Sequence, residues 1–375
     1  MSFKIDEHRV LYRSERFFSA FPSVIALPKG DVLLGFRRAP DHRWLFGEKA
    51  ESDLNAVDHV HFRSHIALRR FSSGLEPLGD AAPMPMHGEA GDQDANLFRH
   101  SCGRILQHGF LWYPVTIETA KRLGAEKRQV LTSEHFGAGY VFWGGYVRFS
   151  DDEGRTWSDY IELPVNEQGD VSGGPYVQGT VAVRGKMAEL KDGSLVFAGY
   201  TAGSRDRSEQ QTRFFLSKDN GKTWELSNNA LTVEGKSLQE PSVATWPEGQ
   251  LSVFHRTTNN EDHLIVATGK SVDQLEEPFS TGVKGHPYDP LLLPDGRLFL
   301  SYGYRHEPMG VRARVASSLE ELNSAPEIII RDNSPSRDTG YPSATLLSDG
   351  RILVAYYIAD NQGIRGIEGT ILSTA

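Results

Sequence analysis

Acidic, basic and phenolic side chains recur in this chain at fixed distances from turn glycines. Four of them stand nine residues before such a glycine: Asp94, Arg184, Glu240 and Tyr341. Four more stand seven residues after one: Arg37, Tyr200, Arg256 and Tyr357. In an antiparallel hairpin these two positions lie side by side, so both sets are expected near one end of their strands. Convergent groups of this kind predict a site for a polar ligand, and solvated loop ends are the alternative.

The elements that must position these residues are six repeated hairpins. Each has a β-rich run, a turn ending in Gly and a second β-rich run, as in EPSVATWPEGQLSVFHR. The turn glycines are Gly30, Gly103, Gly193, Gly249, Gly296 and Gly350. Glycine accepts the positive φ that such turns need, and units of this length have room for four strands. We therefore predict an all-β, six-bladed β-propeller that forms a single domain over residues 1–375; a pair of packed sandwiches is the rival fold.

Two further segments are nearly identical: residues 150–157 (SDDEGRTW) and 217–224 (SKDNGKTW). Both fit S-x-D-x-G-x-T-W, in which Asp caps turn amides, Gly takes the left-handed position and Trp packs under the turn. This pattern resembles the Asp-box, or bacterial neuraminidase repeat, of the sialidase superfamily. In that family the boxes are outer-edge turns, so we expect no catalytic role for Asp152 or Asp219.

The resemblance implies a catalytic pair. Sialidases carry a Glu followed sixteen residues later by an Arg, which fits Glu240 and Arg256, and a Tyr at the start of the last blade, which fits Tyr341. In the family this Tyr is the nucleophile and the Glu is its general base. A carboxylate at the anomeric carbon of the substrate repels a carboxylate nucleophile, whereas a phenol deprotonated in place avoids that repulsion.

An acid/base carboxylate is also implied, just before a strand that here reads IALRR (residues 66–70). Asp58 is the candidate and Asp53 the second choice. His59, His61 and His65 lie in the same segment; a histidine titrates near neutral pH and is an alternative proton donor, and we place His65 among the substrate-binding residues. Zinc at His59 and His61 is an alternative, but spacing fixes no third ligand, so we expect no metal or other cofactor.

Sialidases hold the substrate carboxylate with three arginines from separate blades, because guanidinium forks match that group. Only Arg256 is recovered at its expected place. Ala20 and Met309 stand where the other two are expected. Arg305 and Arg312 lie close to the second gap, and the remaining substrate-binding candidates are Arg37, Arg184 and Asp94.

Three functions follow from these residues. The first is a retaining exo-glycosidase of sialidase type that releases a terminal acidic sugar. The second is β-elimination on a uronate, with Tyr341 or a histidine as the base. The third is a carbohydrate-binding propeller without catalysis, and the fold does not decide among them. The paired Glu240 and Tyr341 favour the first, and the replaced arginines with the histidine-rich segment favour the second.

Charge and composition narrow the partners. The chain has 40 basic and 49 acidic residues, a net charge of −9, which disfavours nucleic acid and anionic membranes as partners. It has one cysteine, Cys102, so no intrachain disulfide can form. The first residues lack a secretory pattern, and from this we expect a cytoplasmic protein. Residues 40–62 and 118–135 are expected to be loop insertions, the first either a lid or a simple surface loop and the second a short surface helix.

Overall fold

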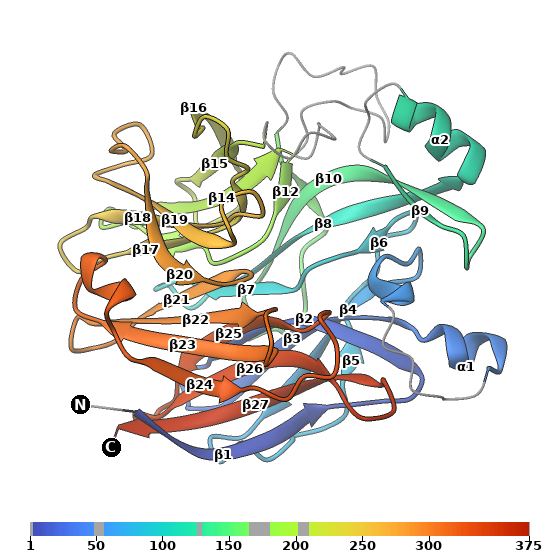
Figure 1. Ribbon diagram of the computed structural model, residues 1–375, viewed down its shortest axis with the longest axis horizontal. Coiled ribbons are helices and arrows are strands. Elements are labelled where there is room, and N and C mark those ends of the chain that lie inside the picture. The colour runs from blue at the N-terminus through green and yellow to red at the C-terminus, as the bar shows by residue number, and fades with distance from the viewer. Residues whose placement is uncertain (1–2, 49–55, 126–129, 165–180, 202–209, 375) are drawn as a thin grey trace.

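Six antiparallel sheets surround a central axis. The computed structural model describes residues 3–48, 56–125, 130–164, 181–201 and 210–374, and its sheets are the blades of a β-propeller (Figure 1). The predicted all-β, six-bladed fold is confirmed. Blade one contains β2 (Phe17–Ala26), β3 (Val32–Pro40), β4 (His65–Phe71) and β5 (Ala82–Pro83). Blade two contains β6 (Gly91–Asp92), β7 (Asn96–Arg99), β8 (Ile105–Thr116), β9 (Val130–Ser133), β10 (Ala138–Ser150) and β11 (Ile161–Glu162).

The other four blades follow in chain order. Blade three contains β12 (Val181–Val183), β13 (Ala188–Glu189), β14 (Leu195–Thr201), β15 (Thr212–Ser217) and β16 (Glu225–Leu231). Blade four contains β17 (Gln239–Thr245), β18 (Leu251–Arg256), β19 (His263–Gly269) and β20 (Phe279–Lys284). Blade five contains β21 (Tyr288–Leu292), β22 (Leu298–Tyr304), β23 (Gly310–Ala316) and β24 (Glu327–Arg331). Blade six contains β25 (Gly340–Leu346), β26 (Ile352–Ala359), β27 (Arg365–Thr374) and β1 (Phe3–Tyr12).

Each repeated hairpin supplies inner strands of its blade. Between β2 and β3, Gly30 has a φ of +89°, and a Cβ at this position would lie 2.9 Å from Oγ of Ser348 in the neighbouring turn. In the last hairpin the second strand is the more deeply buried: β26 is buried along its whole length, whereas β25 ends in two partly buried residues. Apolar side chains from adjacent blades meet between the sheets, as Phe36 and Leu353 do between blades one and six. The core is therefore divided among the gaps between the blades.

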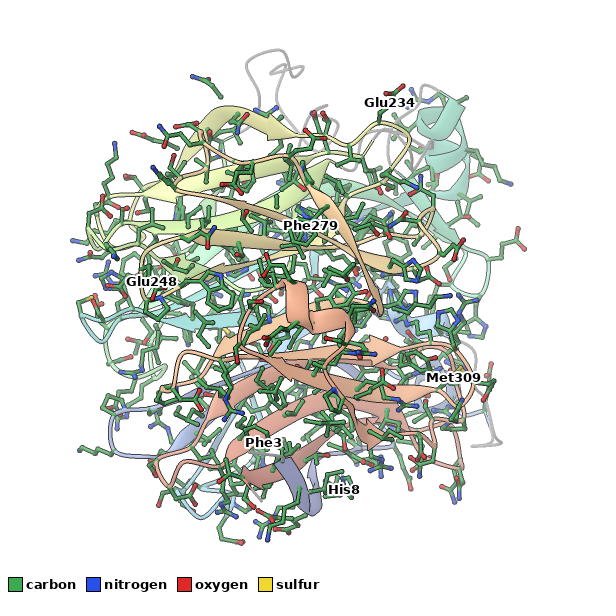
Figure 2. All side chains as sticks on the ribbon, turned by 60° about the vertical axis from the view of Figure 1, so that its left-hand side comes forward. Phe3, His8, Glu234, Glu248, Phe279 and Met309 are labelled. Carbon is green, nitrogen blue, oxygen red and sulfur yellow. The ribbon has the colours of Figure 1, made fainter. Side chains whose placement is uncertain are left out.

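The two ends of the chain close the ring together. β1 pairs antiparallel with β27, so the first strand completes the last blade, and the termini lie side by side (Figure 1). Figure 2 labels Phe3 and His8 on this strand. The ring of Phe3 packs edge-on against Phe299 at 5.8 Å, and Nδ1 of His8 lies 2.8 Å from Oγ1 of Thr370.

Both Asp-boxes form the predicted turns, after β10 and β15. In the first box, Asp152 accepts hydrogen bonds from the backbone and hydroxyl of Thr156 at 2.8 and 2.6 Å, and Trp157 donates to the carbonyl of Gly154 at 3.2 Å. The second box repeats these bonds with Asp219 at its centre. Both aspartates are thus occupied by their own turns, at the outer side of the blades.

Among the described residues, four short helical elements accompany the blades: α1 (His42–Phe46), η1 (Val57–His59), α2 (Ile117–Ala125) and η3 (Glu320–Asn323). The first two lie within residues 40–62, and α2 lies in the second predicted insertion, where a short helix was expected. Among the helices that the structure describes, none has the length and apolar composition needed to cross a membrane.

Candidate active site

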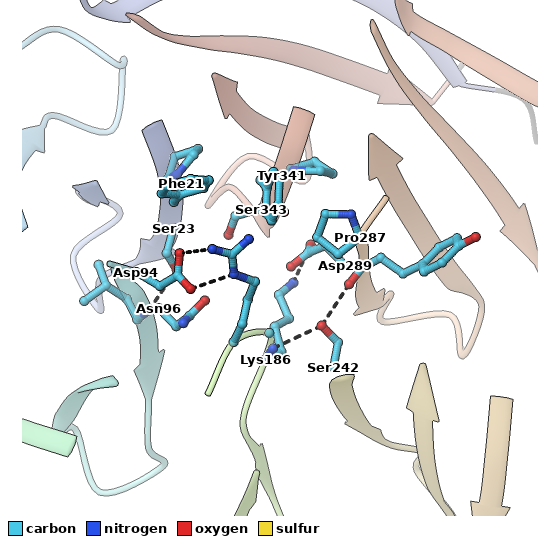
Figure 3. Close-up of a pocket in the computed structure, with 16 residues that line it drawn as sticks. Phe21, Ser23, Asp94, Asn96, Lys186, Ser242, Pro287, Asp289, Tyr341 and Ser343 are labelled. Carbon is cyan, nitrogen blue, oxygen red and sulfur yellow. Dashed lines mark hydrogen bonds and ion pairs between the residues drawn. The ribbon is translucent and has the colours of Figure 1, made fainter. Parts of the chain in front are cut away.

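Residues at equivalent places in the six hairpins meet at the axis of the propeller. Five of the six residues that stand nine positions before the turn glycines line one axial cavity: Phe21, Asp94, Arg184, Pro287 and Tyr341 (Figure 3). The sixth, Glu240, is bonded to Tyr341. Below them Nζ of Lys186 lies 2.9 Å from Oδ2 of Asp289. The structure therefore brings together the residues that the repeat predicted to converge.

Three residues of this ring have an unusual backbone. Phe21, Glu240 and Tyr341 have φ angles of +54°, +46° and +47°, in the left-handed region that bulky side chains seldom adopt. Each lies at a break in the pairing of the first hairpin strand with the second, as between Gly340 and Ser343. Backbone strain of this kind costs on the order of 1–3 kcal/mol per residue and clusters at functional sites. Here the bulge turns the side chains toward the axis.

Tyr341, Glu240 and Arg256 form a closed set of hydrogen bonds. The Tyr341 hydroxyl donates to Oε1 of Glu240 at 2.8 Å. Nη1 of Arg256 donates to Oε2 of Glu240 at 2.8 Å and to the Tyr341 hydroxyl at 3.0 Å. Tyr341 and Glu240 are 7% and 6% exposed, so these bonds are shielded from water. The proton of the phenol therefore points at a carboxylate, with a cation beside both oxygens.

The surrounding charges set opposite protonation states for the pair. Burial opposes ionisation of Glu240, but Arg256 and Arg184 outweigh it and lower the pKa of this carboxyl to about 2. Burial and the Glu240 charge raise the pKa of Tyr341 above its ordinary value, against the opposing effect of the arginines. At neutral pH the resting pair is thus a carboxylate and a neutral phenol, the combination that a base and its nucleophile require.

Arg184 connects this pair to Asp94. Its guanidinium donates to both carboxylate oxygens of Asp94, at 2.6 and 2.5 Å, and to Oε1 of Glu240 at 3.0 Å. The same group lies over the Tyr341 ring, 4.1 Å from its centre, and 4.6 Å from the centre of the Phe21 ring. A cation over the face of a phenol stabilises negative charge on it. Arg184, predicted for substrate binding, here links Glu240 to Asp94, which was predicted for the same role.

The carboxylate of Asp58, the predicted acid/base, is bonded to His42. Oδ2 of Asp58 lies 2.7 Å from Nδ1 of His42, and the Asp58 side chain is only 2% exposed. Burial raises the pKa of Asp58. No contact recorded among the described residues joins its carboxylate to Tyr341 or Glu240. Asp53, the second choice, lies outside the described residues.

The next residue, His59, lies at the mouth of the axial cavity, where the carboxylate of Asp58 was expected. Its ring packs edge-on against Phe21 at 5.1 Å between centres, and Nδ1 lies 3.3 Å from Oδ1 of Asp338. Asp338 also accepts from the Tyr357 hydroxyl at 2.7 Å and pairs with Nε of Arg365 at 3.0 Å. Burial opposes ionisation, but His59 and Arg365 hold the pKa of Asp338 well below its usual range. The histidine side chain remains 36% exposed, so its ring is oriented by a carboxylate and open to solvent.

Two residues predicted to bind substrate are used for packing in the structure. Arg37 is fully buried and donates to the backbone oxygens of Asp92 and Asp58, at 3.3 and 2.9 Å. Nε2 of His65 accepts from Nε of Arg38 at 2.7 Å, and burial lowers the pKa of His65 to about 4. The Arg37 bonds join backbone of blades one and two, and the His65 bond joins neighbouring strands of blade one, so we correct both assignments to supporting residues.

The two arginines near the gap at Met309 differ. Arg305 lies 5.2 Å from the centre of the Tyr341 ring and donates to the carbonyl of Thr339 at 3.3 Å, so it is at the site. Arg312 is buried in blade five, where it donates to the carbonyl of Pro308 at 2.8 Å and stacks on Tyr304. The substrate-binding assignment of Arg312 is thus corrected to a packing role. Figure 2 shows Met309 at the margin of the molecule.

His59 and His61 are not grouped as metal ligands. His61 is buried with its ring stacked on Phe62 at 4.5 Å between centres, whereas His59 pairs with Asp338. Within the described ranges, the side-chain groups with metal-binding spacing contain neither histidine. The zinc alternative weighed for this pair has no support in the geometry.

Comparison with known proteins identifies the family. The BNR repeat-like domain matches residues 129–354, more than half of the chain. The chain belongs to this family. A sialidase from Paraclostridium sordellii is 30% identical to this BNR repeat-like chain over 87 residues, and the match spans about a fifth of each protein (23% and 22%).

Solved structures extend the likeness to the whole propeller. A protein of unknown function from Dyadobacter fermentans is 32% identical, with a TM-score of 0.87 over 100% of this chain and 99% of that one. The K499G mutant of NanB sialidase from Streptococcus pneumoniae has a TM-score of 0.63 at 13% identity, covering 98% and 70% of the two chains. A leech intramolecular trans-sialidase complexed with 2,7-anhydro-Neu5Ac has a TM-score of 0.58 at 14% identity, covering 97% and 70%. These two sialidase structures and this chain therefore have the same fold.

One residue of the BNR repeat-like site escaped sequence reasoning. Asp338 lies before β25, in a segment that reads DTGYPS, and no fixed distance from a turn glycine marks it. The sequence feature that could have identified Asp338 is its place three residues before Tyr341, the predicted nucleophile. His59 was considered only as an alternative to Asp58, because spacing does not show which of two adjacent side chains turns inward.

Proposed function

We propose that this protein is a sialidase-like glycoside hydrolase that removes a terminal acidic sugar with retention of configuration. The observation that carries the proposal is the closed set of bonds among Tyr341, Glu240 and Arg256. A phenol bonded to a buried carboxylate, with cations against both, supplies a nucleophile that loses its proton only as the reaction proceeds. A protein that only binds carbohydrate has no need of such a pair.

In the first step the Tyr341 oxygen attacks the anomeric carbon. Its proton passes to Glu240 along the 2.8 Å hydrogen bond, the glycosidic bond breaks, and the leaving oxygen takes a proton from an acid. Arg184 and Arg256 lie against the phenol and stabilise its developing negative charge. In the second step water attacks the glycosyl-tyrosine, the tyrosine oxygen regains its proton from Glu240, and the water proton returns to the acid/base residue.

We propose His59 as that acid/base residue, positioned by Asp338. A carboxylate on Nδ1 leaves Nε2 for proton transfer, as in other histidine–aspartate pairs. Asp58 stays the residue predicted from the family resemblance, although its carboxylate is turned to His42. The test compares His59→Asn with Asp58→Asn on two aryl glycosides. A phenol of low pKa leaves without protonation, so loss of the acid should spare the substrate that carries it. Equal loss on both substrates in His59→Asn would reject this role.

Arg256 and Arg305 are the proposed anchors for the acidic group of the sugar. Nε of Arg256 is buried and makes no hydrogen bond in the described chain, and Arg305 holds only a backbone carbonyl and, at 3.5 Å, the Tyr357 hydroxyl. Arg305 therefore keeps donors for a ligand, and the Arg256 side chain, bonded to the Tyr341 hydroxyl, is 15% exposed. Ala20 and Met309 replace the other expected arginines, so the substrate carboxylate is held differently from that of the sialidase pattern.

Uronate elimination is a second candidate for two reasons. Ala20 and Met309 replace two expected arginines, and His59, paired with Asp338, lies at the mouth of the axial cavity. In that reaction His59 or Tyr341 would remove the proton at C5, and the arginines would neutralise the carboxylate.

One assay separates the candidates. Aryl glycosides of sialic acid, related keto-acid sugars and uronic acids are incubated with the parent chain, with Tyr341→Phe and with Tyr302→Phe, a buried tyrosine of blade five, as the matched control. The proposal predicts release of a free acidic sugar that is lost only in Tyr341→Phe. An ultraviolet-absorbing unsaturated uronate would establish the elimination instead. Absence of any reaction across the panel would leave a binding propeller.

A further inference from the structure

Three side chains of the types that can ligate a metal ion lie together at the mouth of the axial cavity, beside the site described above. Asp262 precedes β19, His286 lies between β20 and β21, and His306 lies between β22 and β23. Their ligand atoms all lie within 4.8 Å of one another. Electrostatic interaction of His286 with Arg256 and Arg305 places the cluster next to the arginines of the active site. The three loops come from two adjacent blades, so the fold itself assembles the group.

The distances suit one ion held by three ligands. Nε2 of His286 lies 3.0 Å from Oδ1 of Asp262, and Nε2 of His306 lies 3.3 Å from Oδ2 of the same carboxylate. Adjacent ligands of a tetrahedral zinc ion, at about 2.0–2.1 Å from the metal, lie roughly 3.3 Å apart. Both histidines thus present the same nitrogen to the carboxylate at the separation that a shared ion requires.

Hydrogen bonding leaves the histidines unsatisfied. Nε2 of His306 is shielded from solvent, yet it makes no hydrogen bond in the described chain although a carboxylate oxygen is 3.3 Å away. The side chain of His286 is 2% exposed; its Nε2 faces Asp262, and its Nδ1, on the other side of the ring, has no hydrogen-bond partner among the described residues. Buried imidazole nitrogens are normally paired, so such a group needs an explanation. An ion between the three side chains would engage the lone pairs that face it.

The carboxylate is held in place by its own backbone. Asp262 has a φ of +61°, and its carbonyl accepts hydrogen bonds from the backbone of Gly285 at 3.1 Å and from the Tyr288 hydroxyl at 3.2 Å. Asp262 is therefore tied to the loop that carries His286. A site whose ligands are fixed before the ion binds loses less conformational entropy on binding.

We propose that Asp262, His286 and His306 bind a divalent transition-metal ion, with zinc the best fit to two imidazoles and one carboxylate. Three protein ligands leave a fourth position for water or an anion. Met309, which replaces an expected arginine, stands in the same loop as His306. If the proposed function holds, the ion adds positive charge where that arginine is lacking, beside Arg256 and Arg305. The binding of the ion itself does not depend on the proposed function.

The test measures uptake of metal by the full chain. Chelator-treated protein is titrated with Zn²⁺ and Co²⁺ against a chromophoric chelator, alongside Asp262→Asn and His306→Ala. His135→Ala is the matched control, because His135 belongs to a separate group with His42 and Glu48. We expect one ion per chain, the strong visible absorption of four-coordinate Co²⁺, and affinity weakened about tenfold or more in the two site variants alone.

Two results would overturn the proposal. One is no uptake of either ion by the parent chain at micromolar concentration. The other is uptake that His135→Ala abolishes and that His306→Ala leaves unchanged. Thermal unfolding of each variant without metal shows whether a loss of binding is a loss of fold. Activity of the metal-free and loaded chain is measured separately, so failure of the proposed function does not affect the binding result.

Discussion

At the scale of single residues, the site is governed by competition between burial and charge. Burial favours the neutral form of both Glu240 and Tyr341, and the arginines favour the charged form of both. The arginines prevail at the carboxyl and burial prevails at the phenol, because two guanidinium groups bond directly to Glu240. The proton therefore rests on Tyr341 and can move only when negative charge on the phenol is relieved by a reacting carbon.

Replacing Glu240 with Gln tests this description. The amide keeps the shape of the side chain but takes no proton, so kcat should fall by about 10²–10⁴ on the substrate identified by the panel. Glu234→Gln, an exposed change in the turn between β16 and β17, is the control and should leave kcat unchanged. Full activity of Glu240→Gln in a folded protein would remove the general base from the mechanism.

Asp92 offers a separate test through stability. Burial is the main cause that raises its pKa from 3.8 to about 6, although hydrogen bonds from Tyr146 and Tyr160 oppose the shift. Between these pH values the folded chain keeps a proton that the unfolded chain has released, so this group destabilises the fold as pH rises from about 4 to about 6. At 1.36 kcal/mol per pKa unit the loss is on the order of 3 kcal/mol.

Asp92→Asn should therefore gain stability relative to the parent as pH rises across this range. Urea unfolding at pH 4, 5, 6 and 7 measures the difference. Asp192→Asn is the control: hydrogen bonds from Ser194 lower the pKa of that exposed carboxyl below 3.8, so its stability difference should stay nearly constant from pH 4 to 7. A stability difference for Asp92→Asn that does not change with pH would contradict the assignment.

At the scale of elements, the hairpin decides which residues could be predicted. Residues on the inner strands hold a fixed distance from the turn glycine, so their convergence could be predicted from spacing, as for Arg184, Glu240 and Tyr341. Loop residues have no such constraint. The direction of Asp58 and the packing role of Arg312 depend on tertiary contacts within blades one and five, and Asp338 reaches His59 across blades six and one. No local pattern encodes these contacts.

The Asp-box turns can be tested with two glycines of nearly equal φ. Gly221 and Gly193 have φ angles of +83° and +81°, but a Cβ at Gly221 would collide with Leu106, whereas one at Gly193 meets nothing within 4 Å. Alanine at either position carries the backbone penalty of roughly 1–2 kcal/mol. Gly221→Ala should lower the free energy of unfolding by a further amount of about 1–3 kcal/mol, the usual cost of overpacking. Equal unfolding free energies for the two variants would show that the box does not pack on blade two.

At the scale of the whole molecule, closure of the ring joins the ends of the chain. The pairing of β1 with β27 links residues more than 350 positions apart, such as Phe3 and Thr374. The repeat predicted the number of blades, but the sequence before the first hairpin carries no sign of the blade it completes. The end of the chain supplies only three strands of blade six, β25, β26 and β27. The closed ring therefore takes β1 as the fourth strand, and no pattern in the sequence of β1 indicates this.

The closing strand should contribute to the stability of the whole propeller. Leu11 is 2% exposed in the core between blades one and six, whereas Val10 beside it is 56% exposed. Leu11→Ala should lower the free energy of unfolding by about 2–5 kcal/mol, and Val10→Ala should change it little. Denaturant unfolding followed by tryptophan fluorescence measures both. Equal effects would mean that β1 is not part of the folded core.

The most direct test of the account is the identity of the residue that bonds to the sugar. The chain is incubated with a fluorinated analogue, bearing a fluoride leaving group, of the acidic sugar that the panel identifies, and its peptides are weighed by mass spectrometry. The account predicts one added glycosyl group, on the peptide that contains Tyr341, and no label in Tyr341→Phe. A label on another residue, or hydrolysis of the substrate with no covalent adduct, would contradict it.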